Sequence, residues 1–179
     1  MLAAAACGYK GICWFRFYDS PVVPNYHGSP VDEYGESTIY YDHMKRSIRR
    51  FQDHYGEIFP KLKRKATYFF GEDRKRGSYP RFEDGTHDVL EHVRVSWEES
   101  LISFFEHEET GEEYFCVVNI SREHPEHYEF FFDYDKYDIH EVYANGKRGG
   151  PVGRGPRDEA WEDNFLYPGQ LGLFKIIKK

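Results

Sequence analysis

The spacing of hydrophobic residues divides the chain into a helical segment and a longer segment of short strands. Between residues 40 and 62, apolar side chains recur at steps of three and four, as on one face of an amphipathic helix. Ser37 or Thr38 can cap the start of this helix. Gly56 and Pro60 are expected to kink or split the helix near its end.

Beyond residue 65 the apolar period shortens to two, which predicts β-strands. Turn signals at 109–112 and at Asn145-Gly146 separate neighbouring strands. Short strands at this spacing indicate an antiparallel sandwich or a small barrel. The predicted fold class is α+β and mainly β: an antiparallel β-sandwich preceded by a strand, a loop and a long helix. Seven strands are expected, at 66–70, 89–95, 101–107, 113–120, 127–132, 138–143 and 172–177.

The residues ahead of the helix predict a strand and a long loop. Residues 11–18 (GICWFRFY) are apolar apart from one charge, which is typical of a strand buried on both faces in a parallel sheet. Residues 19–35 contain three prolines and two glycines and predict an irregular loop. Residues 1–7 are expected to form the last turn of a helix that ends at Gly8. Because a native chain rarely opens within an element, we expect a piece of a larger protein.

Length and charge bear on the domain organisation. The chain has 179 residues, fewer than the roughly 250 of a complete (β/α)8 barrel. Residues 1–88 carry 14 basic and 12 acidic side chains (net +2), whereas residues 89–179 carry 10 and 19 (net −9). We therefore expect two units: a strand, loop and helix at 1–65 and a β-sandwich at 89–179, connected by a short strand and a polar loop at 66–88.

The helix and the residues after it are rich in lysine and arginine, which would suit a phosphate-binding face. However, Arg46, Arg49 and Arg50 lie opposite or beside the apolar stripe, as on a solvated helix face. The second half of the chain is acidic and no nucleic-acid motif is present, so no nucleic-acid partner is expected. No apolar stretch approaches the roughly 18 residues that span a bilayer, which predicts a soluble chain without a membrane partner.

One histidine pair is a candidate for metal binding. His124 and His127 could act as ligands beside Glu123 or Glu126. Pro125 places the pair in a loop, and no third ligand with diagnostic spacing accompanies it. Solvated loop histidines are the preferred interpretation.

The sequence also contains two acidic clusters and three cysteines, and neither group indicates a cofactor site. The clusters at 106–113 and 133–138 do not match a calcium-binding loop and are interpreted as ordinary turn chemistry. The cysteines are spaced neither as a zinc site nor as a redox pair. Cys13 and Cys116 lie in apolar runs and are expected to be buried. No metal ion or cofactor is expected.

The aromatic residues, with Phe and Tyr numbering 15 each, favour carbohydrate binding instead. Across 14–19 a strand ends in aromatic residues and opens into the loop that contains His27, and barrel enzymes bind substrate at such an edge. Aromatic rings pack on the apolar faces of sugars, while Arg and His donate hydrogen bonds to hydroxyls. Within an intact parent enzyme, Phe17 and His27 are the candidates for this role, and packing in the core is the alternative that stays open for Phe17. Trp14 and Phe15 are expected in the core.

Residues 8–12 (GYKGI) and 14–17 (WFRF) resemble the eighth barrel strand of clan-A glycoside hydrolases, especially the microbial β-galactosidases of family 42. The segment 40–62 resembles the helix that closes their barrel. Residues 166–170 (LYPGQ), followed by 172–176 (GLFKI), resemble the last strand of the β-sandwich appended to many such barrels.

The resemblance implies roles for individual residues. Phe17 falls where the family usually has a tryptophan that forms a sugar platform, and His27 falls on a loop histidine that helps to hold the sugar. Arg16 belongs to the same substrate-binding run. Pro24 stands where the family has an acidic sugar-binding residue, so the resemblance does not imply a pocket specific for galactose.

The family's catalytic acid and nucleophile come from the fourth and seventh barrel strands, which have no counterpart in this sequence. A retaining mechanism needs the two carboxyl groups about 5–5.5 Å apart. We therefore expect no catalytic residue. The resemblance implies the carboxy-terminal portion of a glycoside hydrolase, whose sandwich has a structural or accessory role. Self-association through exposed strand edges is also expected.

The alternative is a stand-alone carbohydrate-binding or protein-interaction module. In that case exposed rings on the sandwich would form the sugar-binding face. The candidates are Tyr128, Tyr134, Tyr137 and Trp161.

Overall fold

The structure of the chain is a computed structural model that describes residues 1–13, 17, 19, 28–71, 79–97, 99–143 and 165–179, and the backbone alone of 147–151 and 164. Within these residues the helices are α1 (Leu2–Ala6), α2 (Ile39–Tyr55) and a short 3-10 helix, η1 (Phe59–Lys61). The strands are β1 (Leu62–Phe70), β2 (Leu90–Val95), β3 (Ser100–His107), β4 (Glu113–Asn119), β5 (Glu126–Phe132), β6 (Tyr137–Tyr143), β7 (Lys147–Pro151), β8 (Asn164–Leu166) and β9 (Leu171–Lys178).

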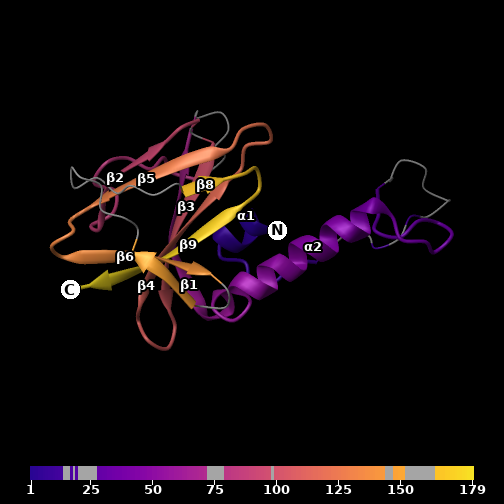
Figure 1. Cartoon of the computed structure of the whole chain (residues 1–179), viewed down its shortest axis with the longest axis horizontal. Coiled ribbons are helices and arrows are strands. Elements are labelled where there is room, and N and C mark those ends of the chain that lie inside the picture. The colour runs from indigo at the N-terminus through magenta and orange to yellow at the C-terminus, as the bar shows by residue number, and fades with distance from the viewer. Residues whose placement is uncertain are drawn as a thin grey trace.

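Two antiparallel sheets pack face to face, which confirms the predicted α+β, mainly β sandwich (Figure 1). The larger sheet has the strand order β1-β3-β4-β9-β6-β7, and the smaller sheet has the order β2-β5-β8. The register of the larger sheet places Phe104, Phe115 and Phe174 side by side. The ring of Phe130, on β5 of the smaller sheet, packs 5.1 Å from Phe115 and 5.0 Å from Phe174 between ring centroids.

The central strands of the larger sheet are buried on both faces. One face forms the core between the sheets, which includes Phe104, Phe115 and Phe174. The neighbouring residues Phe105, Tyr114 and Leu173 point to the other face, where they pack against α1, the end of α2 and η1. Alternate side chains of a strand point to opposite faces, so β3 and β4 are almost continuously apolar because both faces are covered.

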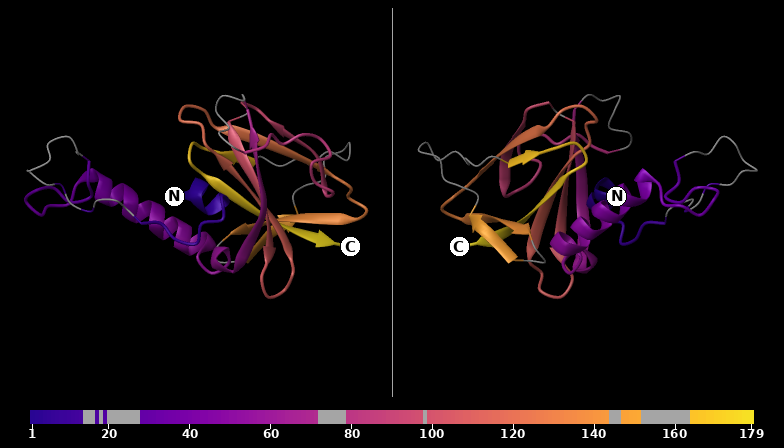
Figure 2. Two further views of the ribbon diagram at one scale, coloured as in Figure 1. Left: turned by 180° about the vertical axis from the view of Figure 1, so that it is seen from behind. Right: turned by 45° about the vertical axis from the view of Figure 1, so that its right-hand side comes forward.

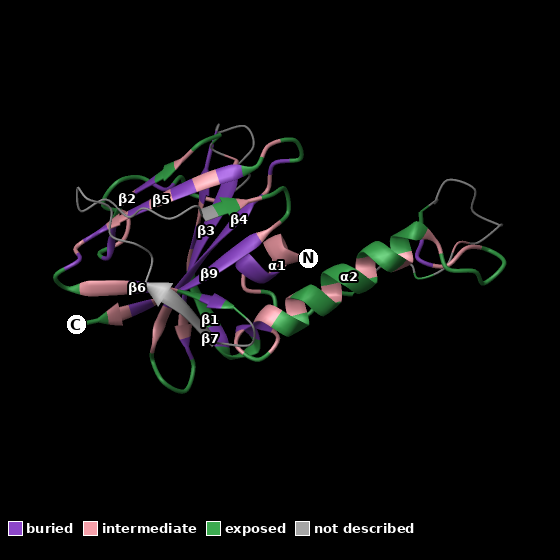
Figure 3. Ribbon diagram, viewed as in Figure 1, coloured by how far each residue is buried: buried purple, intermediate pink, exposed green. Residues whose placement is uncertain are grey.

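The helix α2 contacts the sandwich only at its carboxyl end and projects away from it (Figure 2). Its stripe of Tyr41, Met44, Ile48 and Phe51 is half-buried, and only Tyr55, the last residue, is buried (Figure 3). Residues 9–12 lie along the stripe and enclose a small groove against it. We call α2, together with residues 9–13, 17, 19 and 28–38, the arm.

The ends of α2 agree with the predicted signals. The side chain of Thr38 caps the helix by accepting a hydrogen bond from the backbone N–H of Tyr40 at 3.2 Å. The helix ends at Gly56, and Pro60 lies in η1. The chain then enters β1 at Leu62, earlier than the predicted strand at 66–70, and so β1 runs across the expected unit boundary at residue 65. A register shift between Arg64 and Ala66 interrupts the period of two that marks a strand.

The other six predicted strands are confirmed to within one residue at each end, as β2 to β6 and β9. The strands β7 and β8 were not expected, because neither shows a clear alternation of apolar residues. The turn expected at Asn145-Gly146 lies outside the described residues, although β6 and β7 pair antiparallel on either side of it. No helix in the described part of the chain is long and apolar enough to cross a bilayer.

Two predictions for the amino-terminal region are wrong where the structure describes it. Residues 11–13 and Phe17 belong to no strand, because the segment follows the surface of α2 and pairs with no sheet. Cys13 is therefore exposed, whereas Cys116 is buried as predicted, beneath α1. Trp14, Phe15 and the remainder of the predicted strand lie outside the described residues. The helix predicted at the amino terminus is present as α1 and ends before Gly8, whose φ of 86° suits glycine.

Candidate functional site

A cleft of about 490 Å³ lies where the base of the arm meets the sandwich. This volume is within the range of small-molecule sites, roughly 300–1,000 Å³. The carboxyl half of α2 forms one wall, and the end of β6 and the turn between β8 and β9 form the other. The cleft is lined by Met1, Leu2, Ser47, Arg50, Phe51, His54, Tyr55, Glu141, Tyr143, Phe165, Leu166, Pro168, Gly169, Gln170 and Leu171.

The helical period brings the polar residues of α2 to the cleft. Ser47, Arg50 and His54 are spaced by three and four residues, so they lie on one face of the helix beside Phe51. The buried phenol of Tyr55 closes the base of this wall, since its Oη donates a hydrogen bond of 2.8 Å to the backbone carbonyl of Leu171. This bond holds the end of α2 against the start of β9.

The charges of Glu141 and Arg50 have opposite effects on the pKa of the Tyr55 phenol. Burial raises its pKa above the ordinary value, the negative charge of Glu141 raises it further, and the positive charge of Arg50 opposes the shift. The phenol therefore stays protonated and keeps its role as a donor. Arg50 on the helix and Glu141 on β6 both lie within electrostatic range of one ring, so the cleft offers a cationic donor and an anionic acceptor.

Two exposed aromatic rings line the sheet side of the cleft. The side chain of Tyr143, at the end of β6, is 42% exposed, and that of Phe165, on β8, is 52% exposed. A large apolar side chain that stays in contact with solvent beside polar groups is a feature of binding surfaces. Such rings can pack against the apolar C–H face of a sugar.

The turn between β8 and β9 is held by the buried side chain of Asn119. The amide Nδ2 of Asn119 donates hydrogen bonds of 2.8 Å to the backbone carbonyls of Leu166 and His124. The backbone N–H of Gly169 donates to the carbonyl of Asn119 at 2.9 Å, and Gly169 has a φ of 75°, which favours glycine. Gln170 is thereby fixed at the mouth of the cleft.

The structure does not bring the sequence-predicted substrate residues to this cleft. Phe17 lies on the arm, where its ring is 52% exposed and meets Tyr41 edge to face at 6.4 Å between centroids. Arg16, His27 and Trp161 lie outside the described residues. Phe17 is the one candidate of this group that the structure describes, and it contributes no side chain to the cleft.

The rings predicted to form an exposed sugar-binding face are mostly buried. Tyr128 is fully buried and its Oη lies 2.6 Å from the hydroxyl of Ser100, Tyr134 is buried, and Tyr137 is half-buried. The prediction was wrong for Tyr128 because Tyr128, Phe130 and Phe132 point into the core, and the residues between them face outward.

The rings of His124 and His127 each contact an aromatic ring. His124 stacks on Trp97 with ring centroids 4.7 Å apart, and His127 lies 4.8 Å from Phe165. Nε2 of His124 lies 3.8 Å from a carboxylate oxygen of Glu123. No group of three or more potential metal ligands occurs among the described residues.

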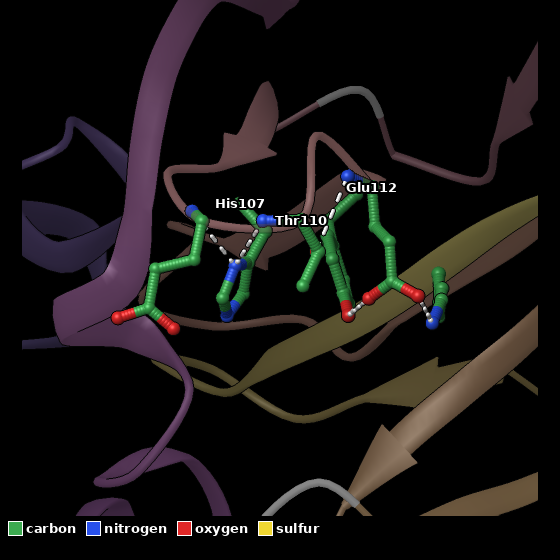
Figure 4. A network of polar contacts seen from close by, with 6 residues as sticks. His107, Thr110 and Glu112 are labelled. Carbon is green, nitrogen blue, oxygen red and sulfur yellow. Dashed lines mark hydrogen bonds and ion pairs between the residues drawn. The ribbon is translucent and has the colours of Figure 1, made fainter.

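The acidic cluster at 106–113 lies around the hairpin between β3 and β4 (Figure 4). Nδ1 of His107 accepts hydrogen bonds from the backbone N–H groups of Glu109 and Thr110, both at 3.3 Å. The carboxylate of Glu112 accepts a hydrogen bond from the phenol of Tyr114 at 3.1 Å and forms an ion pair with Lys175. The cluster therefore forms a turn, as predicted, and also ion pairs that were not predicted.

Two further glutamates near this hairpin also form ion pairs with lysines. Glu106 pairs with Lys65 at 2.8 Å, and Glu113 pairs with Lys178 at 3.3 Å. Ion pairing with lysine lowers the pKa of Glu106 and of Glu112. These carboxylates are thus neutralised within the chain.

Comparison with protein-family models, with curated proteins and with solved structures finds no match to this chain. The cleft is therefore interpreted from its own geometry: the exposed rings of Tyr143 and Phe165 line it together with Arg50, His54, Glu141 and Gln170.

Proposed function

We propose that the chain is a non-catalytic accessory part of a carbohydrate-hydrolysing protein and that the cleft at the base of its arm binds a saccharide. The observation that carries this proposal is that exposed aromatic rings and charged and amide groups line the same cleft. Sugars present apolar C–H faces and rings of hydroxyls, and therefore require both kinds of group in one site.

The polar residues of the cleft favour binding over hydrolysis. Hydrolysis of a glycosidic bond uses two carboxyl groups that flank the bond. Glu141 is the only carboxylate among the described residues that line the cleft. A single carboxylate does not supply both the general acid and the second carboxyl group that this reaction needs. Glu141 is thus suited to accept hydrogen bonds from sugar hydroxyls.

The arm supports an accessory role within a larger assembly. Among the described residues, ten large apolar side chains are exposed, and six of them lie on the arm. They are Tyr9, Ile12, Phe17, Tyr34, Ile39 and Tyr40. Apolar side chains concentrated on a projecting element are typical of surfaces that contact another protein or domain. The resemblance to a barrel-closing helix makes a glycoside hydrolase barrel the proposed neighbour.

Glycan-array binding with the purified chain tests the saccharide site. The chain is expected to retain a defined set of glycans and to release no product from aryl glycosides. Tyr143→Ala should abolish the array signal, while Tyr34→Ala, which removes an exposed ring of the arm, should leave it unchanged. An array without signal, or equal signals from the wild type and Tyr143→Ala, would contradict the proposal.

A further inference from the structure

A second group of exposed rings lies on the sandwich next to the cleft. The side chain of Trp97, in the turn between β2 and β3, is 59% exposed and stacks on His124 at an interplanar angle of 21°. Phe165 packs on His127 at 4.8 Å, and Tyr167 follows it in the turn after β8.

Exposed large apolar side chains on the sandwich are confined to this region. Apart from the arm, the described residues with such side chains are Trp97, Tyr143, Phe165 and Tyr167. Tyr143 and Phe165 line the cleft, and Tyr167 lies in the turn that carries Gln170. The other large apolar side chains of the described part of the sandwich are buried or half-buried. The restriction to one region indicates a common ligand.

Phe165 connects the cleft with the outer rings. It lines the cleft and also contacts His127, which pairs with it across β5 and β8. The backbone N–H of His127 donates to the hydroxyl of Ser96 at 3.0 Å, so the turn that carries Trp97 is attached to the same strand. The side chain of Asn119 joins the loop of His124 to β8.

The turn that carries Trp97 is held in place by a buried carboxylate. Glu126 is fully buried and accepts hydrogen bonds from the backbone N–H groups of Trp97 at 2.9 Å and Glu99 at 3.1 Å, and from the hydroxyl of Ser96 at 3.2 Å. A buried carboxylate with three donors fixes the backbone around it. The indole is therefore exposed on a preorganised turn, which lowers the entropy cost of binding.

We propose that the cleft and these outer rings form one continuous track for a linear oligosaccharide, with one sugar in the cleft and later sugars on Phe165 and Trp97. The inference rests on the proposed saccharide site and extends it to the length of the ligand. A single-stranded nucleic acid also stacks on aromatic rings, but it needs a positively charged groove. Residues 89–179, which carry most of the track, have a net charge of −9 from 10 basic and 19 acidic side chains.

Calorimetric titrations with saccharides of one to six units test this track, using β-1,4-linked glucose and β-1,4-linked galactose as the probes. The affinity of the wild type is expected to rise by about tenfold between the monosaccharide and the tetrasaccharide. This rise corresponds to about 1.4 kcal/mol of additional binding free energy. Trp97→Ala should reduce this increase, because only the ring of Phe165 then remains for the later sugars, and it should leave the monosaccharide affinity unchanged. The backbone N–H of residue 97 remains available to Glu126 in this variant, so the turn should keep its structure.

Tyr34→Ala is the matched control, because it removes an exposed ring that lies on the arm, and it should leave the length dependence intact. Monosaccharide binding with no gain for longer chains would overturn the track while preserving the saccharide site. Equal loss of affinity for all lengths in Trp97→Ala would also overturn it. A chain that binds none of these saccharides, nor any glycan on the array, would refute the proposed function itself.

Discussion

The phenol of Tyr55, the last residue of α2, donates a hydrogen bond of 2.8 Å to the backbone carbonyl of Leu171, the first residue of β9. The two residues are 116 positions apart in the sequence. Their contact joins the arm to the sandwich and forms the floor of the cleft. This buried hydrogen bond between distant segments therefore adds to the apolar packing that fixes the geometry of the candidate site.

Replacing Tyr55 by Phe should lower the free energy of unfolding by about 1–2 kcal/mol, because the buried carbonyl of Leu171 loses its donor. Denaturant unfolding of the two proteins measures this difference. Tyr34→Phe is the matched control, since the ring of Tyr34 is 83% exposed and its variant should unfold as the wild type does. A stability of Tyr55→Phe equal to that of the wild type would show that the bond does not hold the arm.

His87 should make the protein less stable as the pH falls from 7 to 5. The ring stacks on Phe104 at 3.8 Å, and burial lowers its pKa below the ordinary value of 6.5. The unfolded chain therefore takes up a proton at a higher pH than the folded chain. Stability is fully present above pH 6.5 and decreases as the pH falls from there towards the lowered pKa.

Urea unfolding at pH 7 and pH 5 measures this loss of stability. His87→Gln removes the titrating ring and should show a smaller difference between the two pH values. His43→Gln, at an exposed position of α2, should behave as the wild type. The assignment to His87 fails if His87→Gln loses as much stability between these pH values as the wild type.

Glu112→Gln should lower the stability at pH 7 by less than about 1 kcal/mol, because its ion pair with Lys175 is partly solvated. The hydrogen bond from Lys175 is the main cause of the lowered pKa of Glu112. This contribution is present above the ordinary pKa of 4.5 and disappears as the pH falls through the lowered value. Thermal unfolding of both proteins at pH 7 and pH 3 should show a smaller difference at pH 3 than at pH 7. A difference of equal size at both pH values would mean that packing, and not charge, is responsible.

Alkylation should distinguish the exposed Cys13 from the buried Cys116. Cys13 is exposed and should react with iodoacetamide in the folded protein. Cys116 is buried, and burial raises the pKa of its thiol, so it should react only after unfolding. Mass spectrometry of peptides from native and urea-treated protein measures both. Rapid labelling of Cys116 in the native state would contradict the packing of α1 on the larger sheet.

The sequence was sufficient to predict β2 to β6 and β9, but not the strands β7 and β8 or the path of the amino-terminal segment. An apolar run gives the same local pattern whether it is covered by a second sheet, as in β3, or lies along a helix, as residues 11–13 do. The strand β8 has three residues, too few for a period to show. Burial of Tyr128 depended on which face of β5 meets the core, and the alternation alone cannot decide that.

The cleft was missed because no local motif contains it. Arg50, Glu141 and Phe165 come from three separate elements that only the tertiary structure brings together. Arg50 was interpreted as part of a solvated helix face. Its position relative to the apolar stripe is the same whether that face of the helix meets solvent or lines a cleft, so the sequence pattern cannot separate the two. One usable signal was the turn after β8, where residues 166–170 were already singled out by resemblance.

Saccharide binding in the cleft is the central claim, and Phe165 tests it most directly because its ring belongs to both the cleft and the outer track. Isothermal titration of the glycan that gives the strongest array signal should yield an affinity at least tenfold weaker for Phe165→Ala than for the wild type, with Tyr34→Ala unchanged. Equal affinities for the wild type and Phe165→Ala would contradict the account.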